Sequence, residues 1–290
     1  MPAPTPEEIV ELALTHFADA DIPVSVTDDG LATEDGRVFG LETLRRRLAG
    51  CKASEWAEAV SHHFELLAGI DPSMPETFAE ARPNLRAAVV AAADLGWFEG
   101  ATMERPLVDG LGERLMLRRG MLGMTVSSTV VDGWQVDERE VWAAGRDNAL
   151  LDEPVEVFPT RMGAVGYLTI RGGRWASSQV LGLDRHIGRH DYGALVSIPA
   201  RDEVLVHVIV DEAFVEAALA MLTAAASTFA AAPLPVGCDL YWWDDGSLWR
   251  ICTPGPDGYR YLRVPGFSSA LWRLEEATGS GCRRVRRPSA

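Results

Sequence analysis

The sequence of 290 residues predicts an α+β fold: a mainly helical N-terminal third, then a mixed, mostly antiparallel sheet with packed helices. Helical spacing of apolar residues dominates the first hundred residues. Glycine-punctuated β-rich runs dominate from residue 100 onward, and a tryptophan-rich hairpin follows near the C-terminus. We therefore expect a helical region over 1–99, an α+β domain over 100–281 and a basic, flexible tail over 282–290.

The N-terminal region begins with a helix-capping pattern. Thr5 is a capping hydroxyl, Pro6 suits the first helical position and two glutamates follow, which predicts a helix over 6–19. Further helices are expected over 41–48, 55–67 and, with a break at Pro83, 75–95. A short hairpin with turns at 28–30 and 35–36 is expected between the first two helices.

The middle of the chain alternates β-rich runs with helices. Strands are expected over 103–116, 121–131, 155–158 and 164–170, and Asp137 is expected to cap a helix that reaches residue 150 or 151. The stretch 175–210 reads as a helix, a buried strand over 194–198, a polar corner at 199–202 and a second strand over 204–210. An alanine-rich helix capped by Asp211 follows and ends before Pro233.

The segment 239–252 is the clearest hairpin in the sequence. A three-residue loop of Asp244, Asp245 and Gly246 places glycine where a positive φ is needed. That register sets Trp242 opposite Leu248 and Tyr241 opposite Trp249, with Leu240 facing Arg250. It also sets Cys238 opposite Cys252, and we expect these two residues to be neighbouring thiols.

Charge and composition exclude several classes of protein. A formal charge of −15 argues against a nucleic-acid binder, which needs a basic face. The first residues carry no secretory signal, and the alanine-rich segment 213–232 is too weakly apolar to prefer lipid. We expect a soluble, cytoplasmic protein that uses no membrane. The sequence leaves its oligomeric state open.

Three stretches together resemble the uncharacterised bacterial YtpQ-like family. They are the helix opening at 134–150, the Trp-Ala-Ser-Ser-Gln-Val-Leu stretch at 175–181, and the strand at 195–202 that ends in a Pro-x-Arg-Asp corner. The resemblance covers roughly residues 100–210. Two features depart from the family pattern: 146–150 replaces a simpler Asn-Leu ending, and the aromatic tail after Asp239 has no counterpart. The family has no established activity, so the resemblance implies a fold and no catalytic residue.

The polar residues of 184–202 give the best candidate chemistry. Arg201 either holds a carboxylate or phosphate, or ties a turn to an acid such as Asp147, and we favour the second interpretation. His186 and His190 have the spacing that places two imidazoles on one helix face, but Gly188 between them favours solvated loop histidines over a metal site. Adjacent His62 and His63 point about 100° apart on a helix, so a core-edge His63 and an exposed His62 are expected.

Two functional hypotheses follow. The first is a non-enzymatic protein-binding or adaptor module, which holds a protein partner through an acidic, aromatic face that includes Tyr241, Trp243 and Trp249, with Arg201 as a further binding residue. Most of the C-terminal aromatics are expected in the core, and an exposed patch is the less favoured interpretation of them. The alternative is a hydrolase-like, possibly metal-dependent enzyme that uses His186, His190, Asp191 and Arg201. The sequence contains no phosphate-binding glycine loop, no dinucleotide fingerprint and no zinc-protease motif. We therefore expect no cofactor and favour the binding module.

Overall fold

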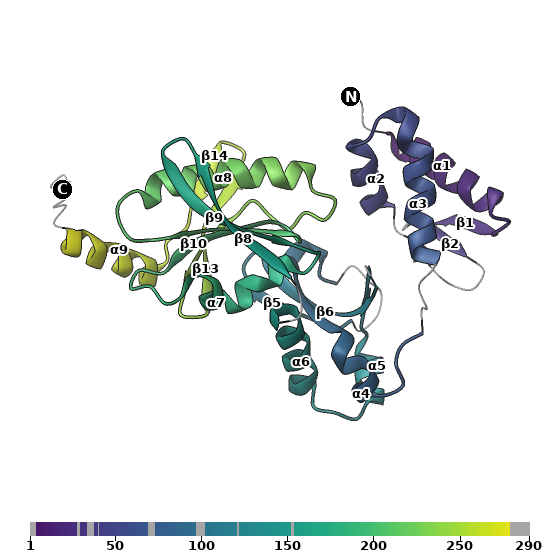
Figure 1. The fold of residues 1–290 in the computed structure, drawn as a ribbon, viewed down its shortest axis with the longest axis horizontal. Helices are drawn as coiled ribbons and strands as arrows, with labels where there is room; N and C mark the ends of the chain where they lie inside the picture. The colour runs from purple at the N-terminus through teal and green to yellow at the C-terminus, as the bar shows by residue number, and fades with distance from the viewer. Residues whose placement is uncertain are drawn as a thin grey trace, which may run out of the picture. The chain divides into compact units, whose positions relative to one another are not determined.

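The fold is α+β, as the sequence predicts (Figure 1). The structure is a computed structural model that describes residues 4–27, 30–33, 38–39, 41–68, 73–96, 102–120, 122–151 and 154–278. The helices are α1 (Pro6–Asp19), α2 (Glu42–Ala49), α3 (Trp56–Ala68), α4 (Phe78–Ala81), α5 (Ser128–Gly133), α6 (Glu138–Leu151), α7 (Asp184–Ile187), α8 (Phe214–Ala231) and α9 (Pro265–Thr278). Short 3-10 segments are η1 (Ala53–Glu55), η2 (Arg82–Asn84), η3 (Ala92–Asp94) and η4 (Ala176–Gly182).

The strands form three antiparallel sheets. They are β1 (Val24–Thr27), β2 (Gly30–Thr33), β3 (Val38–Phe39), β4 (Leu85–Ala91), β5 (Glu104–Val108), β6 (Leu111–Arg119), β7 (Leu122–Thr125), β8 (Val155–Met162), β9 (Val165–Gly172), β10 (Ala194–Ala200), β11 (Glu203–Val208), β12 (Leu240–Asp244), β13 (Ser247–Gly255) and β14 (Gly258–Tyr261). Two compact units result. The first is formed mainly by residues 1–75, and the second mainly by 76–117, 125–230 and 235–290.

The first unit packs α1, α2 and α3 around a small apolar core. Thr5 caps α1 in the predicted capping box, since its hydroxyl accepts from the Glu8 amide and the Glu8 carboxylate accepts from the Thr5 amide. The rings of Phe17 and Phe64 lie 4.6 Å apart in the core. As expected, His63 is buried and His62 is exposed. The predicted turn residues 28, 29, 35 and 36 lie outside the described residues.

The prediction of helices throughout 75–95 is wrong in its second half. Helix α4 and η2 are short, and the chain then forms β4, of which six of seven residues are buried. A strand buried on both faces reads as a continuous apolar run, which periodicity alone does not distinguish from a helix. Because β4 belongs to the second unit, the division between the units falls after Pro75, and not at the expected boundary of 99–100.

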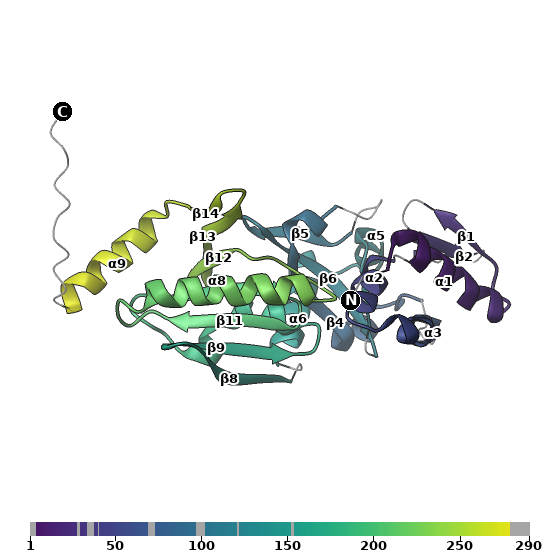
Figure 2. The ribbon, with the colours of Figure 1, turned by 90° about the horizontal axis from the view of Figure 1, so that it is seen from above.

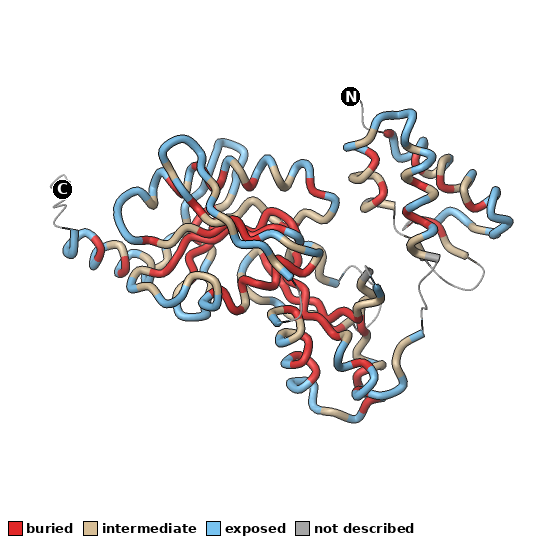
Figure 3. Tube along the Cα trace, viewed as in Figure 1, coloured by how far each residue is buried: buried red, intermediate tan, exposed pale blue. Residues whose placement is uncertain are grey.

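A seven-stranded sheet organises the second unit, in the order β14-β13-β12-β10-β11-β9-β8. Helix α8 runs along one face of this sheet (Figure 2), and the buried residues gather along its central strands (Figure 3). The other face packs against the small sheet β4-β6-β5, with Val89 and Leu111 in the shared core. The predicted strand–corner–strand unit is confirmed as the antiparallel pair β10 and β11.

By length and composition alone, α8 could cross a membrane. In the fold, however, its inward face belongs to the core of the second unit, as the sequence predicts for a packed helix. Its buried residues are Ala217, Ala220, Met221, Leu222 and Ala225. The Asp211 carboxylate accepts a hydrogen bond from the Ala213 amide at 2.9 Å just before the helix, close to the expected cap.

The predicted C-terminal hairpin exists, but its register differs by one residue. Asp245 and Gly246 both have positive φ (44° and 82°), so they form a two-residue turn that matches the twist of the flanking strands. Asp244 therefore pairs with Ser247, and Trp242 pairs with Trp249. Leu240 takes the place opposite Cys252, so the expected pairing of Cys238 with Cys252 is wrong. Both cysteines are free thiols.

The segment η4 covers the outer edge of β4 with side chains. The Ser178 hydroxyl donates to the Ala87 carbonyl at 2.7 Å and accepts from the Val89 amide at 3.2 Å. The neighbouring Ser177 hydroxyl donates to the Val89 carbonyl at 3.0 Å. Two hydroxyls thus satisfy backbone groups that a further strand would otherwise pair. Ser177 and Ser178 thus have a structural role at the edge of β4.

Candidate functional site

His186 belongs to a structural hydrogen-bond chain. The side-chain amide of Gln179 donates to the Ala149 carbonyl at 2.8 Å, which leaves its oxygen to accept from His186 Nε2, also at 2.8 Å. Burial lowers the pKa of His186, Arg185 lowers it further and Asp184 opposes the shift. The half-buried His186 side chain therefore ties α7 to η4, and Gln179 ties η4 to α6.

His190 lies at a different place, on a shallow depression of about 230 Å³. Its Nε2 lies 2.6 Å from the Ile187 carbonyl, which can only accept, so this nitrogen carries the proton. Asp191 and Trp243 also line the depression, together with Arg189, Asp244 and Asp245. Within the described ranges, no group of three or more His, Cys, Asp or Glu side chains is placed to hold a metal.

Arg201 is buried in the turn between β10 and β11, with 8% of its surface exposed. The expected tie to Asp147 is wrong. In the part of the chain that the structure describes, its hydrogen bond runs from Nη1 to the Met116 sulfur at 3.7 Å. The four residues of the predicted catalytic alternative are therefore not brought together: His190 and Asp191 share the depression, whereas His186 and Arg201 have other partners.

Two of the predicted binding aromatics are core residues. Tyr241 and Trp243 are each 2% exposed and pack in the core between the large and small sheets. The Tyr241 hydroxyl donates to Asp239 Oδ2 at 3.3 Å, and burial together with this carboxylate raises the pKa of the phenol well above its ordinary value. Strand alternation places both side chains on the inward face of β12. The expectation that they form an exposed face is therefore wrong.

Three aromatic side chains remain accessible on β13 and β14. Trp249 is 37% exposed, Tyr259 40% and Tyr261 69%. The pairing register places them on one face, because Trp249 faces Trp242, and Tyr261 faces Cys252, which itself faces Leu240. We call Trp249, Tyr259 and Tyr261 the aromatic strip. Sequence reasoning grouped the aromatics by position, but only the pairing of strands shows which of them are exposed.

Exposed arginines lie close to the tyrosines of the aromatic strip. Arg260 lies between the two tyrosines on β14 and Arg263 follows shortly after; both are exposed. Asp239 is engaged by Arg250 Nη1 at 3.3 Å, and Asp244 and Asp245 lie at the opposite turn of the hairpin. Acidic side chains also lie near the aromatic strip, because Asp257 is exposed two residues before Tyr259 and Asp244 pairs with Ser247, two residues before Trp249.

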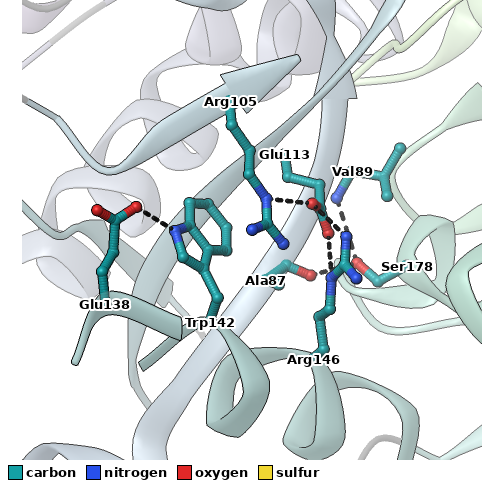
Figure 4. A network of polar contacts seen from close by, with 8 residues as sticks. All are labelled: Ala87, Val89, Arg105, Glu113, Glu138, Trp142, Arg146 and Ser178. Carbon is teal, nitrogen blue, oxygen red and sulfur yellow. Dashed lines mark hydrogen bonds and ion pairs between the residues drawn. The ribbon is translucent and has the colours of Figure 1, made fainter. Parts of the chain in front are cut away.

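A buried carboxylate on the small sheet was missed by sequence reasoning. Glu113 is 0% exposed on β6 and receives hydrogen bonds from Arg105 on β5 and Arg146 on α6 (Figure 4). The Arg105 guanidinium also lies 4.0 Å above the ring of Trp142, whose Nε1 donates to Glu138 at 3.0 Å. The available signal was an acid inside an apolar strand run, which ordinarily requires a buried partner.

Comparisons with family models, with curated proteins and with solved structures found no match. The resemblance to the YtpQ-like family therefore stays a prediction. The function of this protein is therefore inferred from the positions of its side chains.

Proposed function

We propose that this protein is a non-enzymatic binding module that takes an extended, acidic segment of a partner protein along β14. The observation that carries the proposal is an exposed edge strand that bears Tyr259 and Tyr261, two members of the aromatic strip. All four residues of β14 are exposed, and among the described strands β14 pairs with β13 alone. An added strand pairs its backbone with such an edge and draws specificity from alternate side chains.

The two edges of the large sheet differ in a way that favours β14. The opposite edge strand, β8, carries Pro159 in its interior, and proline cannot donate a ladder hydrogen bond. Glu156 adds a negative charge to that strand. Strand β14 contains no proline and presents Arg260 between two tyrosines, the combination that suits a partner with alternating acidic residues.

The hydrolase-like alternative has less support. Its residues are distributed over separate places in the second unit, and His186 and His190 are each tied to a neighbouring structural group. The depression beside His190 is also smaller than the roughly 300–1,000 Å³ that small-molecule sites ordinarily occupy.

The test is selection from a phage-displayed library of random peptides against the full chain, followed by fluorescence anisotropy with the selected peptides. We expect enrichment of acidic, β-prone sequences. Tyr261→Ala and Arg260→Glu should each weaken binding by about tenfold or more, because exposed aromatic and arginine contacts dominate such interfaces. Salt should weaken binding as well.

Trp272→Ala is the matched control. Trp272 is 60% exposed on α9 and lies outside the aromatic strip, so its loss should leave peptide affinity unchanged. A selection without acidic enrichment would contradict the proposal. Peptides that bind Tyr261→Ala and Arg260→Glu as tightly as the parent protein would contradict it equally.

A further inference from the structure

Arg201 stands out because its buried guanidinium lacks a carboxylate partner among the described residues. Its only hydrogen bond in that part of the chain goes to the Met116 sulfur, which is a weak acceptor. Buried arginines are ordinarily paired, because an unmatched charge in a low-dielectric interior is costly. The other donors of its planar fork have no strong acceptor among the described residues. They are not among the fully buried unpaired atoms, so solvent or a ligand can reach them.

The charges that act on Arg201 increase this imbalance. Arg114 and Arg174 act on it as like charges, and Asp94 is the opposing acid. Burial first, and then these two arginines, lower the pKa of Arg201 to about 10. Arg114 is 6% exposed and is itself held by Glu104 at 2.5 Å. A concentration of guanidinium groups is thus built into a protein whose formal charge is −15.

The backbone holds Arg201 in this position firmly. Ser177 donates its amide to the Arg201 carbonyl at 2.9 Å, and Gly172 donates to the Asp202 carbonyl at 3.1 Å. Trp175 and Met116 belong to the apolar cluster beside it. A rigid corner in an apolar setting strengthens any charge-assisted hydrogen bond that the guanidinium makes.

We propose that Arg201, flanked by Arg114 and Arg174, is the anchor of a binding site for the oxyanion group of a small molecule, a carboxylate or a phosphate. The guanidinium fork matches both groups through two parallel hydrogen bonds. A bound anion would accept from the Arg201 donors that no described acceptor takes, and would offset the like charges of Arg114 and Arg174 that act on Arg201. The site is independent of the aromatic strip, so failure of one proposal leaves the other standing.

The test is thermal unfolding of the full chain in sodium phosphate, sodium acetate and sodium chloride at equal ionic strength, followed by isothermal titration with the anion that acts. We expect phosphate or acetate to raise the melting temperature in a saturable manner, and chloride to have no comparable effect. The phosphate and acetate series separate the two ligand chemistries.

Arg201→Met replaces the guanidinium with an apolar chain of similar length beside Met116. We expect it to fold, to unfold at the same or a higher temperature, and to bind the anion at least about tenfold more weakly, since replacing an uncompensated buried charge with an apolar group is neutral or stabilising. Arg201→Lys keeps the charge, loses the fork and should bind with intermediate affinity. Arg189→Met, at an arginine that is 85% exposed, is the matched control and should bind normally.

Two results would overturn the proposal. One is an anion response in Arg201→Met equal to that of the parent protein. The other is a parent protein whose melting temperature is the same in the three salts. If Arg201→Met is also strongly destabilised, Arg201 has a purely structural role. If Arg201→Met fails to fold, the comparison of the parent protein with Arg201→Lys decides the matter in the same way.

Discussion

Arg146 donates two nearly parallel hydrogen bonds to Glu113, from Nε to Oε1 at 2.8 Å and from Nη2 to Oε2 at 2.6 Å. This pair ties α6 to the small sheet beside Gly145, where the helix backbone lies close to β4. At Gly145, an added Cβ would lie 3.1 Å from the Ala87 backbone nitrogen and 2.7 Å from the Leu115 side chain. The ion pair and the glycine therefore act together, since only a close approach lets Arg146 reach a fully buried carboxylate.

Glu113→Gln is expected to lower the free energy of unfolding by about 3 kcal/mol, because it removes the charge that two arginines share while leaving its shape. Urea denaturation measures the change. Glu138→Gln is the control: Glu138 is exposed and accepts from Trp142 Nε1, which a glutamine oxygen also does, so its effect should stay within about 0.5 kcal/mol. Equal midpoints for the two variants would show that the buried pair contributes no net stability.

Gly193 and Gly188 offer a matched pair of substitutions. Both have a left-handed backbone (φ 73° and 74°), but a Cβ at Gly193 would lie 2.3 Å from the Trp243 carbonyl oxygen, whereas Gly188 faces open space. Gly188 has φ 74° and ψ −168°, a region that essentially only glycine adopts, so Gly188→Ala should cost about 1–3 kcal/mol through the backbone conformation alone. Gly193→Ala adds displacement of β12 and should cost about 3 kcal/mol or more. Denaturant unfolding of both variants gives the difference, and equal losses would show that β12 does not crowd Gly193.

His63 predicts an acid-sensitive first unit. Burial, with Arg47 and His62 as neighbouring cations, lowers the pKa of His63 from 6.5 to about 4. The unfolded chain therefore binds the proton more readily than the folded one, and stability falls as the pH drops from about 6.5 to about 4. We expect a loss of about 2 kcal/mol after allowance for partial solvent screening.

Hydrogen exchange of the amides in α3, measured at pH 7 and pH 5, tests this acid sensitivity. His63→Leu should flatten the pH dependence, because it removes the titrating group from the same buried position. His62→Leu, at the exposed neighbour, should largely retain it. Persistence of the full dependence in His63→Leu would assign the effect to another group.

Local signals in the sequence predicted the elements whose determinants lie within a few residues. The capping box at Thr5 and the glycine-containing turn at Gly246 are of this kind, and both elements exist. The register of the hairpin was wrong because a positive φ at Asp245, which aspartate tolerates, shortens the loop to two residues. Strand β4 was taken for a helix because both of its faces are buried.

The candidate sites were harder to predict, since they depend on which strands become neighbours. Trp243 and Trp249 look alike in the sequence, yet one lies between two sheets and the other at an accessible surface. Arg201 was correctly singled out as a polar residue between apolar strands, but its surroundings come from Arg114 and Met116, more than eighty positions away along the chain. Tertiary pairing of this range leaves no periodic trace in a single sequence.

The placement of β12 beside β10 has a consequence for biosynthesis. Strand β10 is complete at Ala200, but one of its edges pairs with residues that begin at Pro235 and continue into β12, after the whole of α8. While the ribosome makes the intervening residues, this apolar edge has no partner and can recruit the same edge of another nascent chain. Messages truncated before codon 240 should accordingly yield insoluble product, and slow translation across α8 should increase the demand for chaperones.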